Sequence, residues 1–170
     1  MISFNCIQDS GGSFDVLYSG DFKTDDKVMT RDDGILKFST FDGNNPPRLV
    51  GGLVNHDKLE HSLGYKVFYS GVAGKNLTQG GGATFPVEDV GLNRGWNWIG
   101  HAPLISYNVN SGIEGVSGSF TTDDQIKTRA GNDVTFTTYD GSTFQGGLLE
   151  LKPGVGYEVK VAKAFTFRYI

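Results

Sequence analysis

Adjacent aspartates occur twice in the chain, and they are its clearest candidates for chemistry. Asp25 and Asp26 lie in KTDDKVMTR, and Asp123 and Asp124 lie in TTDDQIKTR. Two convergent carboxylates could hold a metal ion or act as an acid/base pair. Neighbouring residues of a strand point to opposite faces, however, and no Asp-x-Asp-x-Asp-Gly loop with a distal Glu follows. We therefore interpret both pairs as turn residues that bond to backbone N–H groups, with no metal and no catalytic role.

The other residues that could react or bind a metal lack the spacing that such chemistry needs. His56 and His61 are five positions apart and His101 stands alone, so the sequence predicts no zinc site. Cys6 is the only cysteine, which excludes an internal disulfide bond. No Ser lies in a Gly-x-Ser-x-Gly motif, and the glycines at 80–82 lack the Lys-Ser/Thr of a phosphate loop. The sequence thus assigns no catalytic, metal-binding or cofactor-binding residue.

Trp96 and Trp98 are candidate ligand-binding residues. They are two positions apart in GWNWIG, so they share one face if this segment is a strand. A pair of exposed indoles could stack on sugar rings. A pair of buried indoles would instead fill the core of the second half, because large aromatic side chains dominate core burial. We favour the second interpretation and keep carbohydrate binding as the alternative.

An internal repeat dominates the sequence. The segment 21–43 aligns without a gap with 119–141, and ten of the 23 positions are identical. The motif GGL occurs at 51–53 and 146–148, and LGYKV and VGYEV follow in the same order. Agreement in order, spacing and residue type indicates a duplicated unit.

The repeat predicts the domain organisation. The first β repeat is expected at 1–85, a linker at 86–94 and the second β repeat at 95–170. The second repeat opens with GWNWIG, whereas the equivalent part of the first repeat falls at or before Met1. The opening strand of the first repeat is therefore expected to be truncated. A sheet that lacks a strand exposes unpaired backbone groups, so Ile2 and Phe4 are candidate interface residues.

Alternating residues in both halves predict strands. In 157–161, Tyr157, Val159 and Val161 share one face and charged residues occupy the other. Segments 35–41, 134–140 and 164–170 alternate in the same way, which is typical of half-buried strands. Asp-Gly at 42–43 and 140–141 and Pro-Gly at 153–154 favour turns. The predicted fold class is all-β, with two pseudo-symmetric tandem repeats that form a sandwich or a partly open barrel.

Charge and hydropathy exclude several classes of partner. The formal net charge is −4, and acidic and basic residues alternate along the chain without a basic block, so nucleic acid is not an expected partner. No apolar run approaches the ~20 residues that span a membrane. The first ten residues carry no visible signal peptide. These features leave the compartment unassigned, in a context without disulfide bonds.

Three motifs carry a resemblance to known proteins. GWNWIG, DDQIKTR and LKPGVGYEV of the second half resemble tandem modules with a W-x-W-I-G opening and an L-x-P-G-x-G-Y close, found in uncharacterised proteins of marine microalgae and bacteria. The two-repeat arrangement also resembles the duplicated core of the pyrenoid-shell proteins of diatoms. The first half departs from the pattern, since it lacks the tryptophan opening and the Lys-Pro-Gly turn. The resemblance implies a repeat architecture and no catalytic residues.

Two functions of different classes fit the sequence. The first is a non-enzymatic structural protein that associates with itself or with other structural chains, in a shell, sheet, fibre or virion, because a duplicated β module presents two similar surfaces. The second is a carbohydrate-binding module that uses Trp96 and Trp98. Neither requires a cofactor.

Overall fold

The chain is built from β-strands. The computed structural model describes residues 22–44, 48–53, 62–71, 89–130 and 132–170, and the backbone of 6–7 and 82–83. The regular structure of these residues is entirely β, which confirms the predicted fold class. The described part of the chain contains no helix long and apolar enough to cross a membrane. The strands are β1(Cys6–Ile7), β2(Lys27–Asp32), β3(Ile35–Phe41), β4(Leu49–Gly51), β5(Tyr65–Phe68), β6(Gly82–Ala83), β7(Asp89–Leu92), β8(Gly95–Gly100), β9(Tyr107–Asn108), β10(Ile113–Gly115), β11(Gln125–Ala130), β12(Asp133–Tyr139), β13(Phe144–Gly146), β14(Glu150–Leu151), β15(Gly156–Val161) and β16(Phe165–Tyr169).

The first half contributes a four-stranded antiparallel sheet of order β4-β3-β2-β5. Its central hairpin turns at Asp33 and Gly34, whose φ angles are 49° and 76°. Two successive positive φ angles match the twist of the flanking strands, and Asp-Gly is a preferred pair for this turn. The hairpin register pairs Val28 with Ser39 and Met29 with Phe38.

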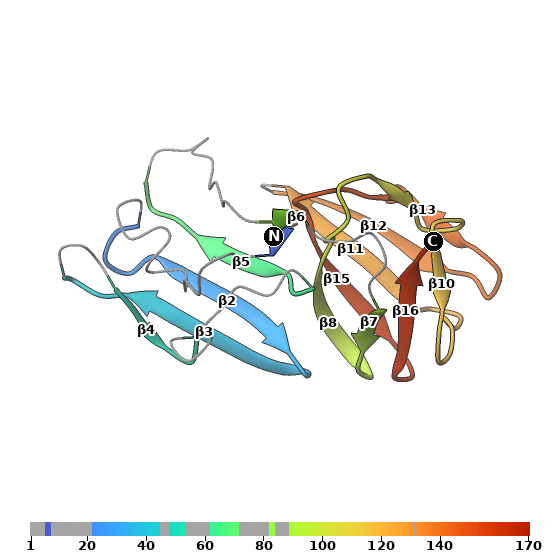
Figure 1. Ribbon diagram of the computed structural model, residues 1–170, viewed down its shortest axis with the longest axis horizontal. Helices are drawn as coiled ribbons and strands as arrows, with labels where there is room; N and C mark the ends of the chain where they lie inside the picture. The colour runs from blue at the N-terminus through green and yellow to red at the C-terminus, as the bar shows by residue number, and fades with distance from the viewer. Residues whose placement is uncertain are drawn as a thin grey trace.

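The second half is a two-layer sandwich (Figure 1). A five-stranded sheet of order β13-β12-β11-β15-β8 lies against a three-stranded sheet of order β10-β16-β7. β7 begins at Asp89, so part of the segment 86–94, which was expected to be a linker, pairs with β16 instead. Two short antiparallel pairs, β9 with β14 and β1 with β6, complete the described strands.

Each half has its own hydrophobic cluster. The cluster of the sandwich lies between its two layers, and the predicted inward faces of β15 and β16 contribute to it. The cluster of the four-stranded sheet is smaller, and Phe22 stacks on Phe41 there with ring centroids 4.3 Å apart. The sandwich cluster contains Val90, Leu92, Ile99, Val109, Ile126, Phe144, Leu148, Leu151, Tyr157, Val159, Val161, Phe165, Phe167 and Tyr169, and the smaller cluster contains Phe22, Val28, Phe41, Leu49, Leu53 and Tyr65.

A short antiparallel contact joins the two large sheets. Leu63 forms a bridge with Ile99. The Gly64 amide donates to the carbonyl oxygen of Trp98 at 3.1 Å, and the Gly100 amide donates to that of Ser62 at 2.9 Å. The start of β5 thereby continues the five-stranded sheet beyond β8, as Figure 1 shows for the neighbouring ends of these strands.

The same local hydrogen bonds occur in both large sheets. The Thr30 hydroxyl donates to the carbonyl oxygen of Gly64 at 2.9 Å, and the Thr128 hydroxyl donates to that of Gly156 at the same distance. The amides that follow Gly51 and Gly146 donate to the carbonyl oxygens of Phe38 and Phe136, at 2.8 Å and 3.0 Å. The strand order β4-β3-β2-β5 has its counterpart in β13-β12-β11-β15.

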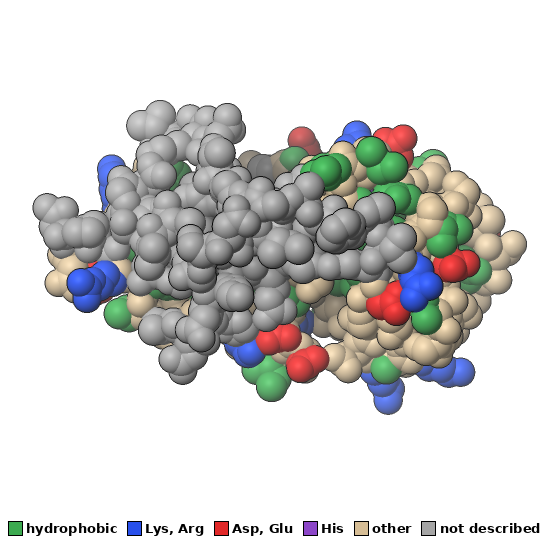
Figure 2. Space-filling model, in the orientation of Figure 1, with side chains coloured by type: hydrophobic (Ala, Val, Ile, Leu, Met, Phe, Trp, Pro, Cys, Tyr) green, Lys and Arg blue, Asp and Glu red, His purple; other side chains and the backbone are tan. Residues whose placement is uncertain are grey.

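Charged side chains of both signs lie among uncharged ones on the part of the second half that is visible in Figure 2. Arg168 on β16 pairs with Asp89 on β7, and their closest atoms, Nε and Oδ1, are 2.6 Å apart. Both side chains are exposed, so this pair contributes little to stability. The buried clusters are therefore the main stabilising feature of the described fold.

We expect Gly146 to be the glycine of the five-stranded sheet at which substitution destabilises the fold most. Its φ angle is 146°, and an added Cβ would lie 2.6 Å from the carbonyl oxygen of Phe136. We expect Gly146→Ala to lower the free energy of unfolding by about 3 kcal/mol, because it combines an unfavourable φ with a backbone clash. Gly154→Ala is the matched control: its φ angle is 74° and the added Cβ meets open space. The control should lower the free energy of unfolding by only about 1 kcal/mol, as measured by urea unfolding. Equal losses in the two variants would contradict the role of the clash.

Candidate binding surface on the outer face of the joined sheet

One side of the joined sheet points away from both hydrophobic clusters, and we call it the outer face. Successive residues of a strand alternate between the two sides. Val28, Ile126 and Val159 point into the clusters, so their neighbours point outward. The outer face consists of Lys27, Met29, Arg31, Leu36, Phe38, Thr40, Val50, Lys66, Phe68, Trp96, Trp98, Gln125, Lys127, Arg129, Val134, Phe136, Thr138, Gln145, Glu158 and Lys160.

A single row of side chains crosses the outer face from one half to the other. Direct cross-strand pairing links its members within each sheet, and a contact between Lys66 and Trp98 links the two sheets. The row runs Phe38, Met29, Lys66, Trp98, Glu158, Lys127 and Phe136. With strands about 4.8 Å apart, these six steps extend over roughly 29 Å.

Apolar side chains are exposed on the outer face. Six large ones are between about two-fifths and three-fifths exposed, and they come from strands of both halves. They are Phe38, Phe68 and Phe136 at 55%, Val50 at 50%, and Leu36 and Val134 at 44%. Leu36 and Phe38 of the alternating segment 35–41, and Val134 and Phe136 of the segment 134–140, therefore face outward. Ser39 and Thr137 occupy inward positions with no exposed surface.

Both tryptophans lie on the outer face. They share one side of β8, as their spacing in the sequence predicted. Neither is a member of the two hydrophobic clusters, but Trp98 is a buried side chain that is only 7% exposed. The Lys66 Nζ lies 4.1 Å from the centroid of its ring, and the Lys127 Nζ lies 4.0 Å from that of Trp96. Two cation–π contacts thus cover the indole rings.

Glu158 lies between these two lysines. Its carboxylate pairs with Lys66 from the first half and with Lys127 from β11, the latter at 3.0 Å. Burial raises the pKa of Glu158, but the hydrogen bonds and the charges of both lysines lower it more, so the pKa stays below its usual range. The carboxylate is therefore ionised at neutral pH and links the two halves electrostatically.

The paired aspartates have two separate structural roles. Asp25 and Asp123 both have φ angles of 71°, which places them in the left-handed region that Asp tolerates in turns. The following residue of each pair is buried. The Asp124 carboxylate accepts the amides of Thr121 at 2.7 Å and Ala162 at 2.8 Å. It therefore ties the turn before β11 to the end of β15.

The first half has the same arrangement at Asp26. Its carboxylate accepts the amides of Lys23 and Ser70, both at 2.8 Å. Burial raises the pKa of Asp26, but these hydrogen bonds lower it more, so the pKa lies below its usual value. The described residues contain no group of three His, Cys, Asp or Glu side chains placed to hold a metal ion. The geometry supports the interpretation of both pairs as turn residues.

His101 is a fully buried side chain at the end of β8. Its Nε2 lies 2.8 Å from the carbonyl oxygen of Ile105, and its ring meets Tyr169 edge-on at 4.9 Å. Burial lowers the pKa of His101, and the hydrogen bond to Ile105 opposes this only in part. The imidazole is therefore neutral at pH 7 and belongs to the packing of the sandwich.

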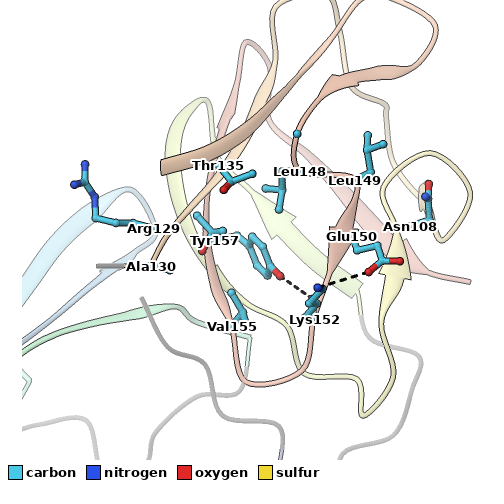
Figure 3. A pocket seen from close by; sticks show the side chains of 12 residues that line it. Asn108, Arg129, Ala130, Thr135, Leu148, Leu149, Glu150, Lys152, Val155 and Tyr157 are labelled. Atoms are coloured by element: carbon cyan, nitrogen blue, oxygen red, sulfur yellow. Dashed lines mark hydrogen bonds and ion pairs between the residues drawn. The ribbon is translucent and has the colours of Figure 1, made fainter. Parts of the chain in front are cut away.

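An open cleft of about 680 Å³ lies at one end of the sandwich (Figure 3). The Lys152 amide donates to the Tyr157 hydroxyl at 2.7 Å, and the Lys152 Nζ lies 3.8 Å from Glu150. Burial raises the pKa of Tyr157 to about 12, so the phenol stays protonated at neutral pH and cannot act as a base. Thr135 and Leu148 line the same cleft. This arrangement contains no nucleophile next to a base.

The remaining predicted interface residues, Ile2 and Phe4, lie outside the described residues. Sequence reasoning also missed three members of the outer face that contact the indoles or link them: Lys66, Lys127 and Glu158. The signal that could have found them is the alternation of β5, β11 and β15, because each stands between two inward-facing residues.

The two aspartates of one pair should respond differently to substitution. Asp124→Ala leaves the amides of Thr121 and Ala162 without their acceptor, so we expect a loss of about 2–3 kcal/mol in the free energy of unfolding. Asp123→Gly should be neutral within about 0.5 kcal/mol, because glycine adopts the φ of 71° without strain. Chemical unfolding measures the free energy of unfolding of both variants. The same measurement on the wild type with and without chelator tests for a bound metal ion. A large effect of chelator on the wild type would contradict the turn interpretation.

His101 should make stability depend on pH near neutrality. Its folded pKa lies below the unfolded value of about 6.5, so the unfolded state binds the proton first. Stability is complete above about pH 6.5 and decreases as the pH falls toward the folded pKa. His101→Gln should flatten the free energy of unfolding between about pH 7 and pH 5 in urea titrations. The same slope in variant and wild type would rule out His101 as its source.

Comparison of the chain with protein-family models, with curated proteins and with solved structures gave no match. Fold and candidate surface are thus described from the residues of this chain alone.

Proposed function

We propose that this protein is a non-enzymatic structural protein, a duplicated β module that packs with neighbouring chains into a larger assembly such as a shell, a sheet, a fibre or a virion. The observation that carries the proposal is the set of exposed apolar side chains on the outer face, which come from strands of both halves. Large exposed apolar surfaces on a folded chain are typical of contact sites for other proteins.

The positions of these side chains support a contact function rather than chance exposure. Phe38 and Phe136 are the outermost members of the same cross-strand row, and both are 55% exposed. Leu36 and Val134 lie two positions before Phe38 and Phe136 on the same strands. A sheet with aromatic and aliphatic side chains on one side offers the composition of an interface core.

We infer that the two large sheets are copies of one unit. The matched strand order, the matched bonds of Thr30 and Thr128, and the two buried carboxylates Asp26 and Asp124 support this. A duplicated unit presents similar contacts twice on a rigid body. Two weak contacts on one body strengthen each other, because the second forms at a high effective concentration.

The chemistry of the described residues supports a non-enzymatic role. The buried carboxylates are engaged with backbone amides, and His101 is enclosed within the sandwich. The cleft at one end of the sandwich offers a protonated Tyr157 and an exposed Lys152–Glu150 pair. An acid/base or nucleophilic mechanism needs a base within reach of the group it activates, and this set does not provide one.

The alternative function is a carbohydrate-binding module that uses Trp96 and Trp98. The place of both indoles on the outer face favours it, since sugar rings stack on aromatic side chains of flat surfaces. The lysines over both rings weigh against it, because Lys66 and Lys127 occupy the positions that a sugar would take. Carbohydrate binding would require both ammonium groups to move.

The assembly proposal predicts that outer-face aromatics control self-association. We expect the wild-type chain to associate at concentrations between about 10 µM and 1 mM in sedimentation equilibrium. Phe38→Ser combined with Phe136→Ser should weaken this association at least about tenfold, because it removes apolar area from the contact. Leu104→Ser combined with Ile105→Ser is the matched control. These residues are 56% and 61% exposed but lie off the outer face, so the control should associate like the wild type.

Two results would argue against the proposal. A wild-type chain that stays monomeric over the whole concentration range, alone and with candidate structural partners, would remove its basis. Retardation of the wild type by a soluble polysaccharide in affinity electrophoresis, abolished by Trp96→Ala, would favour the carbohydrate-binding module instead.

A further inference from the structure

We propose that the outer face binds a second copy of this chain, which presents to it the acidic turns that precede β2 and β11. This inference rests on the proposed assembly function and specifies the partner and the mode of contact. The contact is heterologous, because two different surfaces of the same chain meet in it. Heterologous contacts do not close on themselves unless the rotation between copies allows it, so they generate chains or layers.

The outer face has a strongly basic character. Alternation collects cations from four strands on this one side, although acidic and basic residues are mixed along the sequence. Its charged members are the cations Lys27, Arg31, Lys66, Lys127, Arg129 and Lys160, and the anion Glu158. The face therefore carries five net positive charges.

The rest of the described chain is correspondingly acidic. Of the 13 Lys and Arg and the 13 Asp and Glu among the described residues, six cations and one anion lie on the outer face. Seven cations and 12 anions of the described residues lie elsewhere, an excess of five negative charges. Another copy of this chain thus offers the complementary charge, whereas an external polyanion would be repelled by most of the molecule.

The acidic partner surface is formed by two turns. Asp25 lies beside Asp42, since the Asp25 amide donates to the carbonyl oxygen of Phe41 at 3.0 Å. Asp123 lies beside Asp140 in the same way. Lys23 and Arg48 neighbour the first turn and Lys163 neighbours the second, so the second turn is the more acidic.

Asp25, Asp123 and Asp140 are exposed, and hydrogen bonds fix the carboxylates of Asp42 and Asp140. Asp140 accepts the amides of Ser142 and Thr143, both at 2.8 Å, and these bonds lower its pKa below the usual value. Asp42 accepts the amides of Asn44 and Arg48 at 3.0 Å and 2.9 Å, with the same effect on its pKa. Asp42 and Asp140 are therefore ionised at neutral pH.

The spacing of the two turns matches the spacing of the basic residues. β2 and β11 run in the same direction within the joined sheet, because three antiparallel neighbours separate them. The acidic turns lie at the starts of these strands, and Arg31 and Arg129 are the fifth residue of each. Turns and arginines are therefore both separated by the same four strand spacings, roughly 19 Å.

This match defines the arrangement of neighbouring copies. A copy that lies over the outer face of its neighbour, displaced along the strands by the six residues from Asp25 to Arg31, about 20 Å, brings both of its turns to the two arginines. The exposed Leu36 and Val134, which pair directly with Arg31 and Arg129, then lie beside the bound turns. In this arrangement the charged residues determine how the two copies align, and the apolar side chains provide the attraction between them.

Two reversed-charge variants test the proposal. The face variant is Arg31→Glu with Arg129→Glu, and the turn variant is Asp25→Lys with Asp123→Lys. The control variant is Arg94→Glu with Lys152→Glu, which changes the net charge like the face variant but lies off the outer face. Circular dichroism and thermal melting establish that each variant folds before its association is measured.

We expect each reversed-charge variant to lose association and the mixture of the two variants to recover it. Face and turn variants should each associate at least tenfold more weakly than the wild type, whereas the control should not differ more than about twofold. An equimolar mixture of face and turn variants should recover association to within about threefold, since every contact then joins opposite charges. Association of the wild type should weaken from about 0.05 M to 0.5 M salt.

Other outcomes would overturn the inference. If the wild type assembles and the face variant assembles equally well, the charge-directed contact is wrong and the assembly function stands. An equimolar mixture of face and turn variants that stays monomeric would likewise show that the charge-directed contact is wrong. If the wild type never associates, the assembly function itself fails. Retention of a monomeric wild type on heparin, lost in the face variant, would assign the outer face to a polyanion.

Discussion

The short antiparallel contact between residues 62–64 and β8 is the constraint on which the outer face depends. Among the described residues, the backbone bonds that join the large sheets are the Leu63–Ile99 bridge and two flanking amide bonds. The contact also keeps the alternation of both sheets in phase, so Tyr65 is buried while Lys66 points outward toward Trp98. A slip of one residue would turn every side chain of β5 to the opposite side and break the row across the molecule.

The charged centre of the outer face follows from this contact. Glu158 is the only anion among the described residues of that face, and its side chain is only 17% exposed. It retains its charge because Lys66 and Lys127 both pair with it, one from each sheet. Removing one partner of such a buried arrangement costs far more than the pair contributes, because the remaining charge loses its compensation. The two halves are therefore coupled electrostatically as well as through the backbone.

Much of this structure could be predicted from alternation and turn residues. The inward faces of β15 and β16, the Pro153–Gly154 turn and the shared face of the tryptophans all follow from local sequence. Alternation fixes which residues share a side, but it does not decide which side is buried. That choice depends on the opposing layer, which is remote in sequence. The basic character of the outer face was hidden for the same reason, since the cations are separated along the chain and meet only in the sheet.

Hydropathy does not explain which side of β3 and β12 is buried. Ser39 points inward, where its hydroxyl accepts the Leu53 amide at 2.8 Å, and the residue beside it, Phe38, is left on the outside. The equivalent position in β12 places Thr137 inside and Phe136 outside, and the buried Thr137 Oγ1 has no hydrogen-bond partner among the described residues. Folding alone would favour the reverse, because a buried phenylalanine contributes more than a buried hydroxyl and an exposed one adds a risk of aggregation. Under the proposed assembly function, a contact between chains buries the exposed phenylalanines of both sheets after folding and removes this cost.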